Sequence, residues 1–138
     1  MKNKFAIIGL GQFGMTIAKT LSKKGAEVIA IDKDINKVEH IKEYVSYAVS
    51  LDATDKQALL NQNIEDMDAV IIAIGEDFKS MILCANILTE LSIKRIIGRV
   101  MGENERLILK KLGISEILSP EDEIGKNITN SLLNPNIV

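Results

Sequence analysis

The sequence predicts an α/β fold, a doubly wound parallel sheet of six strands with helices on both faces. Short apolar runs alternate with longer amphipathic segments from end to end, which is the pattern of successive β-α-β units. The chain has 138 residues, 46% of them hydrophobic, which is enough to bury one full core. We therefore expect a single domain over residues 1–138.

Six strands and six helices are expected in alternation. The strands are expected at 4–8, 27–31, 46–50, 69–74, 95–100 and 115–118. The helices are expected at 12–24, 34–43, 55–61, 78–91, 103–112 and 121–133. Gly25 and Gly113 lie where the first and fifth helices should end, and a capping box of Thr54 and Gln57 is expected to start the third. Ser119 followed by a proline is typical of the start of the sixth.

The first strand runs into a glycine turn of the form G-x-G-x-x-G within residues 5–14. Gly9 is expected to permit the tight turn, Gly11 to let backbone N–H groups approach a pyrophosphate, and Gly14 to let the next helix pack closely. A helix N-terminus favours negative charge, because its N–H groups are unpaired and its dipole is positive there. The turn therefore predicts a Rossmann-type sheet that binds a nucleotide.

Asp32 ends the second strand, 21 residues after Gly11. This is about the spacing at which an acidic side chain accepts hydrogen bonds from the hydroxyls of an adenosine ribose. A negative charge there repels a 2′-phosphate, so NADP is expected to bind worse than NAD. The predicted site also includes Gln12 and Phe13 in the turn and Lys33 beside Asp32.

Residues just past the other strands are further candidates, because a ligand lies over the carboxyl ends of an open parallel sheet. Those predicted to contact the nucleotide are Asp52, Ala53, Ala73, Ile74, Gly75 and Arg99. Asp52 and Ala53 are placed to meet adenine, Gly75 the ribose or phosphates, and Arg99 a phosphate. Asp52 equally suits a local loop or helix-cap role, as does Asp77, and Arg99 equally suits a surface ion pair.

Several classes of function are disfavoured by composition. The formal charge is −2, aromatic residues are 4% and no basic run occurs, so nucleic acid is not an expected ligand. Apolar stretches are short and no signal-peptide core is visible, which favours a cytoplasmic protein without membrane insertion. Cys84 is expected to be a buried small hydrophobic residue. No nucleophile with an attendant base is recognisable, so no catalytic residue is assigned, and no metal site is predicted.

One predicted helix is apolar around most of its circumference, from Ser80 to Leu91. A helix on a sheet needs only one apolar stripe. We expect its outer face to pack on another subunit. The alternative is that the chain's own C-terminal helix covers it.

The chain resembles the regulatory subunits of Trk/Ktr potassium-uptake systems, the RCK or TrkA-N domains, and most closely the Ktr-type cytosolic subunit. The resemblance rests on an ordered set of motifs that spans Lys4 to about Leu133: FAIIGLGQFG at 5–14, VIAID at 28–32, SLDAT at 50–54, VIIAIG at 70–75 and LGISEILSPE at 112–121. It implies an adenine-nucleotide-binding Rossmann domain that forms dimers and then a ring, docks on an integral-membrane potassium pore subunit and gates it without catalytic turnover.

Glu121 matches an acidic position that family members place near the nucleotide phosphates, where it serves a cation or a subunit contact. Its neighbours Asp122 and Glu123 are better explained as complements to the helix dipole than as metal ligands. Ktr-type members commonly carry Arg where this chain has Gln12, so NAD, NADH, ATP and ADP all stay open as ligands.

Family subunits usually continue into a smaller C-terminal ligand-binding lobe. No such lobe is recognised here, so the chain is expected to be the N-terminal portion of such a subunit. The alternative function is the cofactor domain of an NAD-dependent oxidoreductase, which rests on fold analogy alone.

Overall fold

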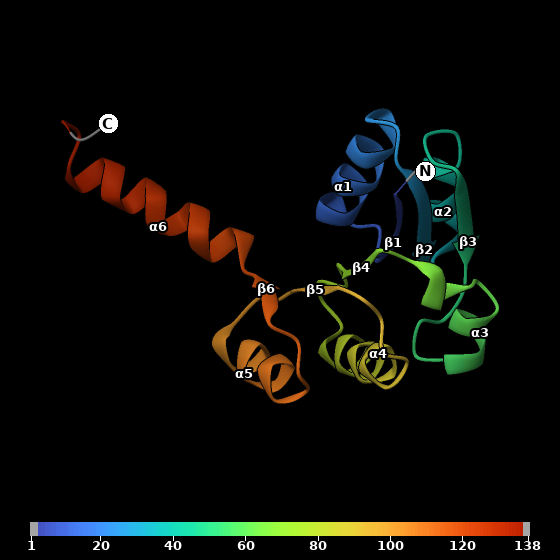
Figure 1. Ribbon diagram of the computed structural model, residues 1–138. Helices are drawn as coiled ribbons and strands as arrows, with labels where there is room; N and C mark the ends of the chain where they lie inside the picture. Colours follow the sequence, from blue (N-terminus) through green and yellow to red (C-terminus); the bar gives the residue numbers. More distant parts are fainter. Residues whose placement is uncertain (1–2, 137–138) are drawn as a thin grey trace.

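A six-stranded, wholly parallel sheet forms the centre of the protein in the computed structural model, which describes residues 3–136 (Figure 1). Its strands are β1 (Lys4–Ile8), β2 (Glu27–Asp32), β3 (Tyr47–Ser50), β4 (Ala69–Ile72), β5 (Ile96–Arg99) and β6 (Glu116–Leu118). The helices are α1 (Gln12–Lys23), α2 (Ile35–Ile41), α3 (Lys56–Leu60), α4 (Phe78–Glu90), α5 (Glu103–Lys111) and α6 (Pro120–Leu133), with a short 3-10 helix at Ile64–Asp66.

The strand order is β3-β2-β1-β4-β5-β6, so the chain moves outward from β1 and then crosses back to β4. This order is the Rossmann arrangement, and it confirms the predicted fold class. The direction of winding reverses between β1 and β4, and helices on the two faces diverge at that point. A crevice is expected there, over the carboxyl ends of the strands.

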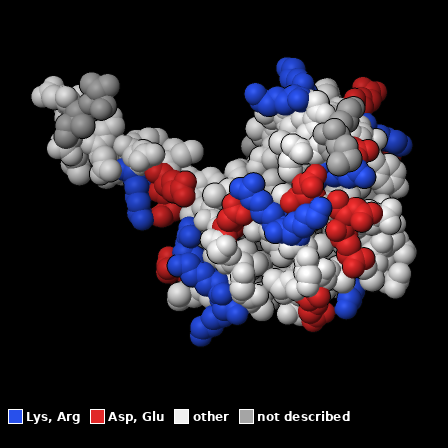
Figure 2. Space-filling view, in the orientation of Figure 1, with Lys and Arg blue, Asp and Glu red and all other residues white. Residues whose placement is uncertain are grey.

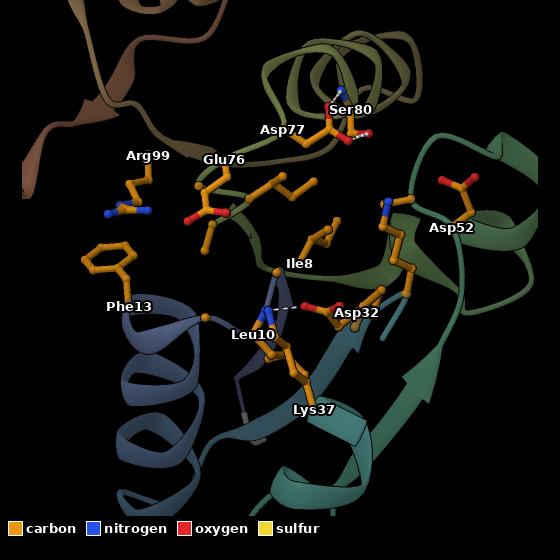
Figure 3. Close-up of a pocket in the computed structure, with 18 of the residues that line it drawn as sticks. Ile8, Leu10, Phe13, Asp32, Lys37, Asp52, Glu76, Asp77, Ser80 and Arg99 are labelled. Carbon is orange, nitrogen blue, oxygen red and sulfur yellow. Dashed lines mark hydrogen bonds between the residues drawn. The ribbon is translucent and has the colours of Figure 1, made fainter. Parts of the chain in front are cut away.

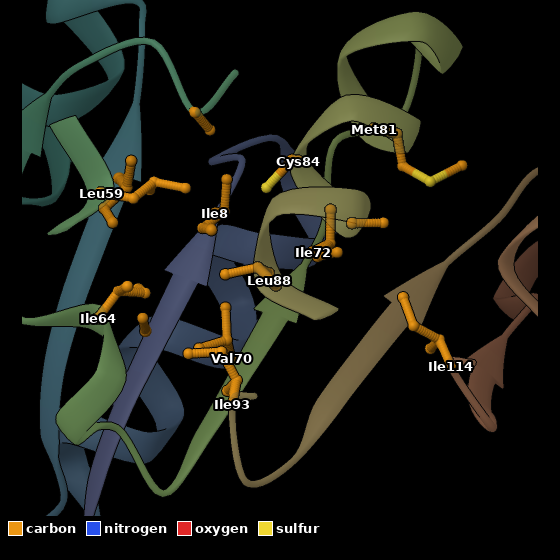
Figure 4. Close-up of a cluster of buried hydrophobic side chains, with 14 of the residues drawn as sticks. Ile8, Leu59, Ile64, Val70, Ile72, Met81, Cys84, Leu88, Ile93 and Ile114 are labelled. Carbon is orange, nitrogen blue, oxygen red and sulfur yellow. The ribbon is translucent and has the colours of Figure 1, made fainter. Parts of the chain in front are cut away.

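Successive side chains along each strand point to opposite faces of the sheet, which divides the core into two layers. Ile7 and its neighbours pack against α1 and α2, whereas Ile8 and Ile72 pack against α3, α4 and α5. Figure 4 shows this second layer, with Cys84 and Leu88 of α4 lying over the strands. Cys84 is buried as predicted, and its burial raises the pKa of its thiol to about 12.

The predicted helix boundaries agree with the structure to within two residues, and one predicted cap is corrected. Gly25 and Gly113 adopt φ values of +96° and +97° just after α1 and α5, as expected of glycines that end helices. The capping box of Thr54 and Gln57 is wrong, because Asp55 caps α3 by accepting hydrogen bonds from the N–H groups of Gln57 and Ala58. The Thr54 hydroxyl instead donates a hydrogen bond to Oδ1 of Asp52.

Helix α6 projects away from the rest of the fold, which we call the body (residues 3–119) (Figure 1). It begins at Pro120 after Ser119, as predicted, and none of its residues, all of which the structure describes, is buried. The alternative that α6 covers α4 is therefore wrong. Four residues of α4, namely Met81, Cys84, Ala85 and Leu88, are buried, and Leu83 on its outer side is 42% exposed.

Across residues 3–136, no helix combines the length and the apolar character that crossing a lipid bilayer requires.

Candidate functional site

The glycine turn is built by close packing of β1, α1 and β4. Gly9 has a φ of +101°, and a Cβ on it would lie 2.7 Å from the carbonyl carbon of Ala73. A Cβ on Gly14 would lie 1.9 Å from the carbonyl oxygen of Gly9. Gly11 differs, because a Cβ there would meet nothing within 4 Å. Two of the glycines are thus required by the fold, whereas the third leaves an open approach to the backbone.

The N-terminus of α1 faces this open space. Its N-cap is Gly11, and among the residues that the structure describes no side chain makes a cap hydrogen bond there. The first amides of a helix have no partner inside the helix. An anion at this position would accept hydrogen bonds from them and interact favourably with the helix dipole.

A cavity of about 420 Å³ lies over the carboxyl ends of the strands beside the turn. This volume is in the range of small-molecule sites. Every residue predicted for the site lines the cavity except Gly14, which lies beneath the turn, and Glu121. Figure 3 shows Asp32, Asp52, Asp77, Arg99 and Phe13 arranged around it.

Asp32 ties the end of β2 to the glycine turn. Its Oδ2 accepts a hydrogen bond from the N–H of Leu10 at 2.8 Å (Figure 3). Its Oδ1 accepts one from the N–H of Asp34 at 2.8 Å. A carboxylate has about four acceptor positions. Asp32 therefore orders the turn and still has acceptor capacity toward the cavity.

Asp52 and Asp77 fill the local roles that the sequence left open, and they line the cavity as well. Asp52 accepts hydrogen bonds from the hydroxyl and the N–H of Thr54, which lower the pKa of its carboxyl. Asp77 caps α4 by accepting from the hydroxyl and the N–H of Ser80, with the same effect on its pKa. Both groups are thus held as carboxylates at neutral pH.

Arg99 lies at the end of β5 and reaches into the cavity beside the turn. Its guanidinium lies 5.4 Å from the ring centroid of Phe13, and a Cβ on Gly75 would come within 2.6 Å of Nη1. Nη2 pairs with Oε1 of Glu121 in α6. Arg99 thus forms an ion pair, the alternative considered from the sequence, and the pair is buried on the Arg99 side (14% exposed) but not on the Glu121 side (52% exposed).

The cavity also contains side chains that the prediction missed. The most informative is Lys37, which Figure 3 shows beside Leu10 and Asp32. Because α2 begins three residues after β2, its first turn returns over the strand end, and that short connection was the available signal. The other lining residues that were not assigned to the site are Ile8, Leu10, Ile31, Leu51, Thr54, Glu76, Asp77 and Ser80, of which Asp77 had been weighed as a candidate. Within residues 3–136, no group of three His, Cys, Asp or Glu is placed to hold a metal ion.

Residues 5–120 match the model of the TrkA-N domain. The whole chain is 38% identical to Ktr system potassium uptake protein C of Bacillus subtilis and covers 62% of that protein's length.

Two solved structures share the fold. The AMP-bound C-terminal domain of Shewanella denitrificans Kef superposes with a TM-score of 0.82 at 17% identity, covering 99% of this chain and 83% of that one. The GsuK channel bound to NAD superposes with a TM-score of 0.73 at 14% identity, covering 86% of this chain and 21% of the channel.

Proposed function

This chain belongs to the TrkA-N domain family, and from that premise we propose that it is a nucleotide-binding regulatory module of a membrane potassium-uptake system. The observation that carries the proposal is the open N-terminus of α1, which lies beside Asp32 at the point where the sheet reverses direction. This combination suits a ligand that carries both phosphate and ribose.

The proposed pose follows from the lining of the cavity. Phosphates lie on the backbone of Gly11, Gln12 and Phe13, with Arg99 as a charged partner. The ribose hydroxyls donate to Asp32, with Lys33 and Lys37 near them.

The adenine base extends toward the far end of the cavity. There it meets Asp52 and Ala53, while Ala73, Ile74 and Gly75 form the wall after β4. Gly9 and Gly14 contribute by holding the turn in shape.

The proposed ligand class is an adenine nucleotide, either NAD or NADH, or ATP or ADP. A neutral Gln12 in the turn provides no ionic contact for a third phosphate. We therefore expect ATP to bind at most modestly better than ADP. The related structures of GsuK bound to NAD and of Kef bound to AMP support an adenine nucleotide as the ligand class.

In the proposed assembly, residues 1–138 act as one RCK N-lobe of a cytoplasmic, non-catalytic subunit. Copies of the chain form a homodimer and then a ring, which lies against the inner face of the membrane through an integral-membrane potassium pore subunit. The similarity to a Ktr potassium uptake protein supports this assignment. A nucleotide regulates such an assembly only if it binds two arrangements of it with different affinity.

Titration calorimetry with NAD, NADH, ATP, ADP and AMP tests the site. Asp32→Ala is expected to weaken binding by about 1–3 kcal/mol, the cost of losing hydrogen bonds to a charged acceptor. Asp34→Ala is the matched control, because Asp34 caps α2 and does not line the cavity. Equal affinities for Asp32→Ala and the unmutated chain would refute the ribose role. NADH consumption with keto acids, or NAD reduction with hydroxy acids, would instead favour an oxidoreductase.

A further inference from the structure

Gly75 follows β4 and lines the cavity, and its backbone does not require a glycine. Its φ lies outside the positive range that Gly9, Gly25 and Gly113 adopt. The space beside it is what excludes a side chain. A Cβ at position 75 would lie 2.6 Å from Nη1 of Arg99 and 3.8 Å from its Cζ, and among the described residues no other atom outside the adjoining chain comes within 4 Å of it. Glycine is therefore required here by one side chain.

The glycine turn is constrained differently. A Cβ on Gly9 would meet main-chain atoms of Ala73 at 2.7 Å, and these cannot move without disturbing a closely packed sheet. At position 75 the obstructing atom is the end of a long side chain, which can rotate away. Gly75→Ala is thus expected to displace the guanidinium of Arg99 and to leave the fold intact.

Phe13 provides a second contact for the same guanidinium. Cζ of Arg99 lies 5.4 Å from the centroid of the Phe13 ring, within the range of a cation–π interaction (Figure 3). The Arg99 side chain is 14% exposed, and its Nε is buried without a hydrogen-bond partner among the described residues. An unsatisfied buried donor costs stability. Such a cost is typical of a group that is held for binding and not for the fold alone.

The position of this charge suits an anion. Phe13 is the second residue of α1, so its contact brings the guanidinium beside the N-terminal turn of that helix. The helix dipole is positive there, and the first N–H groups have no partner inside the helix. Two positive groups side by side repel each other unless an anion lies between them.

We propose that Gly75 and Phe13 are positioning residues, which hold the guanidinium of Arg99 in place for a phosphate of the bound nucleotide. The proposal rests on the proposed nucleotide site and names the residues that set the strength of its phosphate contact. A free arginine side chain loses conformational freedom when it binds a ligand, whereas one that is already packed loses little. Gly75 and Phe13 thus raise affinity through Arg99, and chiefly for ligands that carry phosphate.

Titration calorimetry with ADP and with adenosine tests the proposal in a double-mutant cycle. Gly75→Ala is expected to weaken ADP binding about three- to tenfold, because it moves the guanidinium without removing it. Adenosine has no phosphate, so its affinity should fall by a smaller factor than that of ADP. In an Arg99→Ala background no guanidinium is present to displace, and Gly75→Ala should then change ADP affinity by less than about twofold.

Phe13→Leu is an independent variant that does not alter the loop after β4. It removes the aromatic face, keeps an apolar side chain and is expected to weaken ADP binding about two- to fivefold. This loss should also disappear in the Arg99→Ala background. A loss that persists there would show that the ring does not act through Arg99, and it would overturn the positioning role of Phe13.

The placement of the guanidinium can also be followed without ligand. The chain has three arginines, Arg95, Arg99 and Arg106, so its arginine Nε–H signals in NMR spectra are few. Because Nε of Arg99 is buried, its proton should exchange slowly with water, and Gly75→Ala is expected to accelerate that exchange at least about tenfold. The Nε–H of Arg95 is the internal control and should not change, because it donates to Glu116.

Two results would overturn the role of Gly75 while leaving the nucleotide site in place. The first is an equal loss of ADP affinity by Gly75→Ala in the Arg99 and the Arg99→Ala backgrounds, because position 75 would then act on the ligand directly. The second is unchanged exchange of the Arg99 Nε–H in Gly75→Ala. Absence of ADP binding by the unmutated chain would instead refute the nucleotide site, and this proposal with it.

Discussion

Helices α4 and α6 have similar lengths and both carry several apolar side chains, yet only one of them is buried. Met81 and Leu88 of α4 are 1% and 0% exposed, whereas Leu132 and Leu133 of α6 are 76% and 75% exposed. The difference follows from connectivity. Helix α4 links two neighbouring parallel strands and must cross the sheet, whereas α6 follows β6, the edge strand, and links no two strands of the described sheet.

The larger exposed apolar surface lies on α6 and not, as the sequence led us to expect, on α4. The sequence directed attention to α4, whose outer side has Leu83 as its most exposed aliphatic residue. The distal half of α6 is uncharged and white in Figure 2, and it exposes Ile128 as well as the two leucines. The packing of α4 on another subunit stays a prediction, and α6 now offers the larger apolar face.

Alanine substitutions at two glycines, one in the body and one in α6, are expected to differ most in their effects on stability. Gly14→Ala puts a methyl group 1.9 Å from the Gly9 carbonyl oxygen, so we expect a loss of at least about 3 kcal/mol in the free energy of unfolding. Gly125→Ala in α6 meets nothing within 4 Å and should gain about 0.5–1 kcal/mol of local helix stability. Urea denaturation and far-UV circular dichroism measure the two effects, and a tolerated Gly14→Ala would contradict the geometry of the turn.

Leucine truncation tests burial in the same two helices. Leu88→Ala is expected to cost about 2–5 kcal/mol in the free energy of unfolding, because it removes buried methyl groups and leaves a cavity. Leu132→Ala should change it by less than about 0.5 kcal/mol, since that side chain is exposed. A comparable cost for Leu132→Ala in chemical denaturation would mean that α6 packs on something in solution.

Replacing an exposed apolar residue with glutamate tests which helix mediates self-association. Ile128→Glu is expected to raise the dimer dissociation constant at least about tenfold, which is about 1.4 kcal/mol, because a charge is costly to desolvate in an interface. Leu83→Glu should have a smaller effect, because less apolar surface is exposed around it. Sedimentation velocity over a concentration series measures both. The opposite ranking would return the interface to α4.

The smallest expected effect concerns the cap of α4. Hydrogen bonds from Ser80 lower the pKa of the Asp77 carboxyl below its usual 3.8. The resulting stability is fully present above that value and is lost as pH falls through the lowered pKa of the folded state. Asp77→Asn keeps a capping oxygen but does not titrate, so its stability should depend less on pH below about pH 4. Acid titrations of Asp77→Asn and of the unmutated chain, followed by circular dichroism, would show the same dependence of stability on pH if the Asp77 carboxylate has no such role.

The sequence predicted the sheet and much of the cavity because these follow from local patterns. Glycine spacing, an acid at the end of β2 and strand periodicity each act within one β-α-β unit, and strand order follows from right-handed crossovers. Lys37 was missed although the three-residue step from β2 to α2 was a short-range signal for it. The pairing of Arg99 with Glu121 depends on the direction of α6 relative to β5, and no short-range pattern encodes that direction.

The direction of α6 is likewise not encoded by a short-range sequence pattern. Its apolar residues have helical spacing, which predicts a buried face, and the structure places none of them against the body. Periodicity reports that a helix has an apolar side, but a sequence pattern does not say which surface that side contacts.

Amide chemical shifts measured by NMR during a titration with NAD and with ADP test whether an adenine nucleotide binds at the glycine turn. The largest shifts are expected at the N–H groups of Gly11, Gln12 and Phe13, with smaller ones at Leu10 and Asp34, whose amides donate to Asp32. The distal residues of α6, such as Leu132, should not shift through direct contact. Saturable shifts confined to residues outside the cavity, or no shifts with either nucleotide at millimolar concentration, would show that the glycine turn is not a nucleotide site.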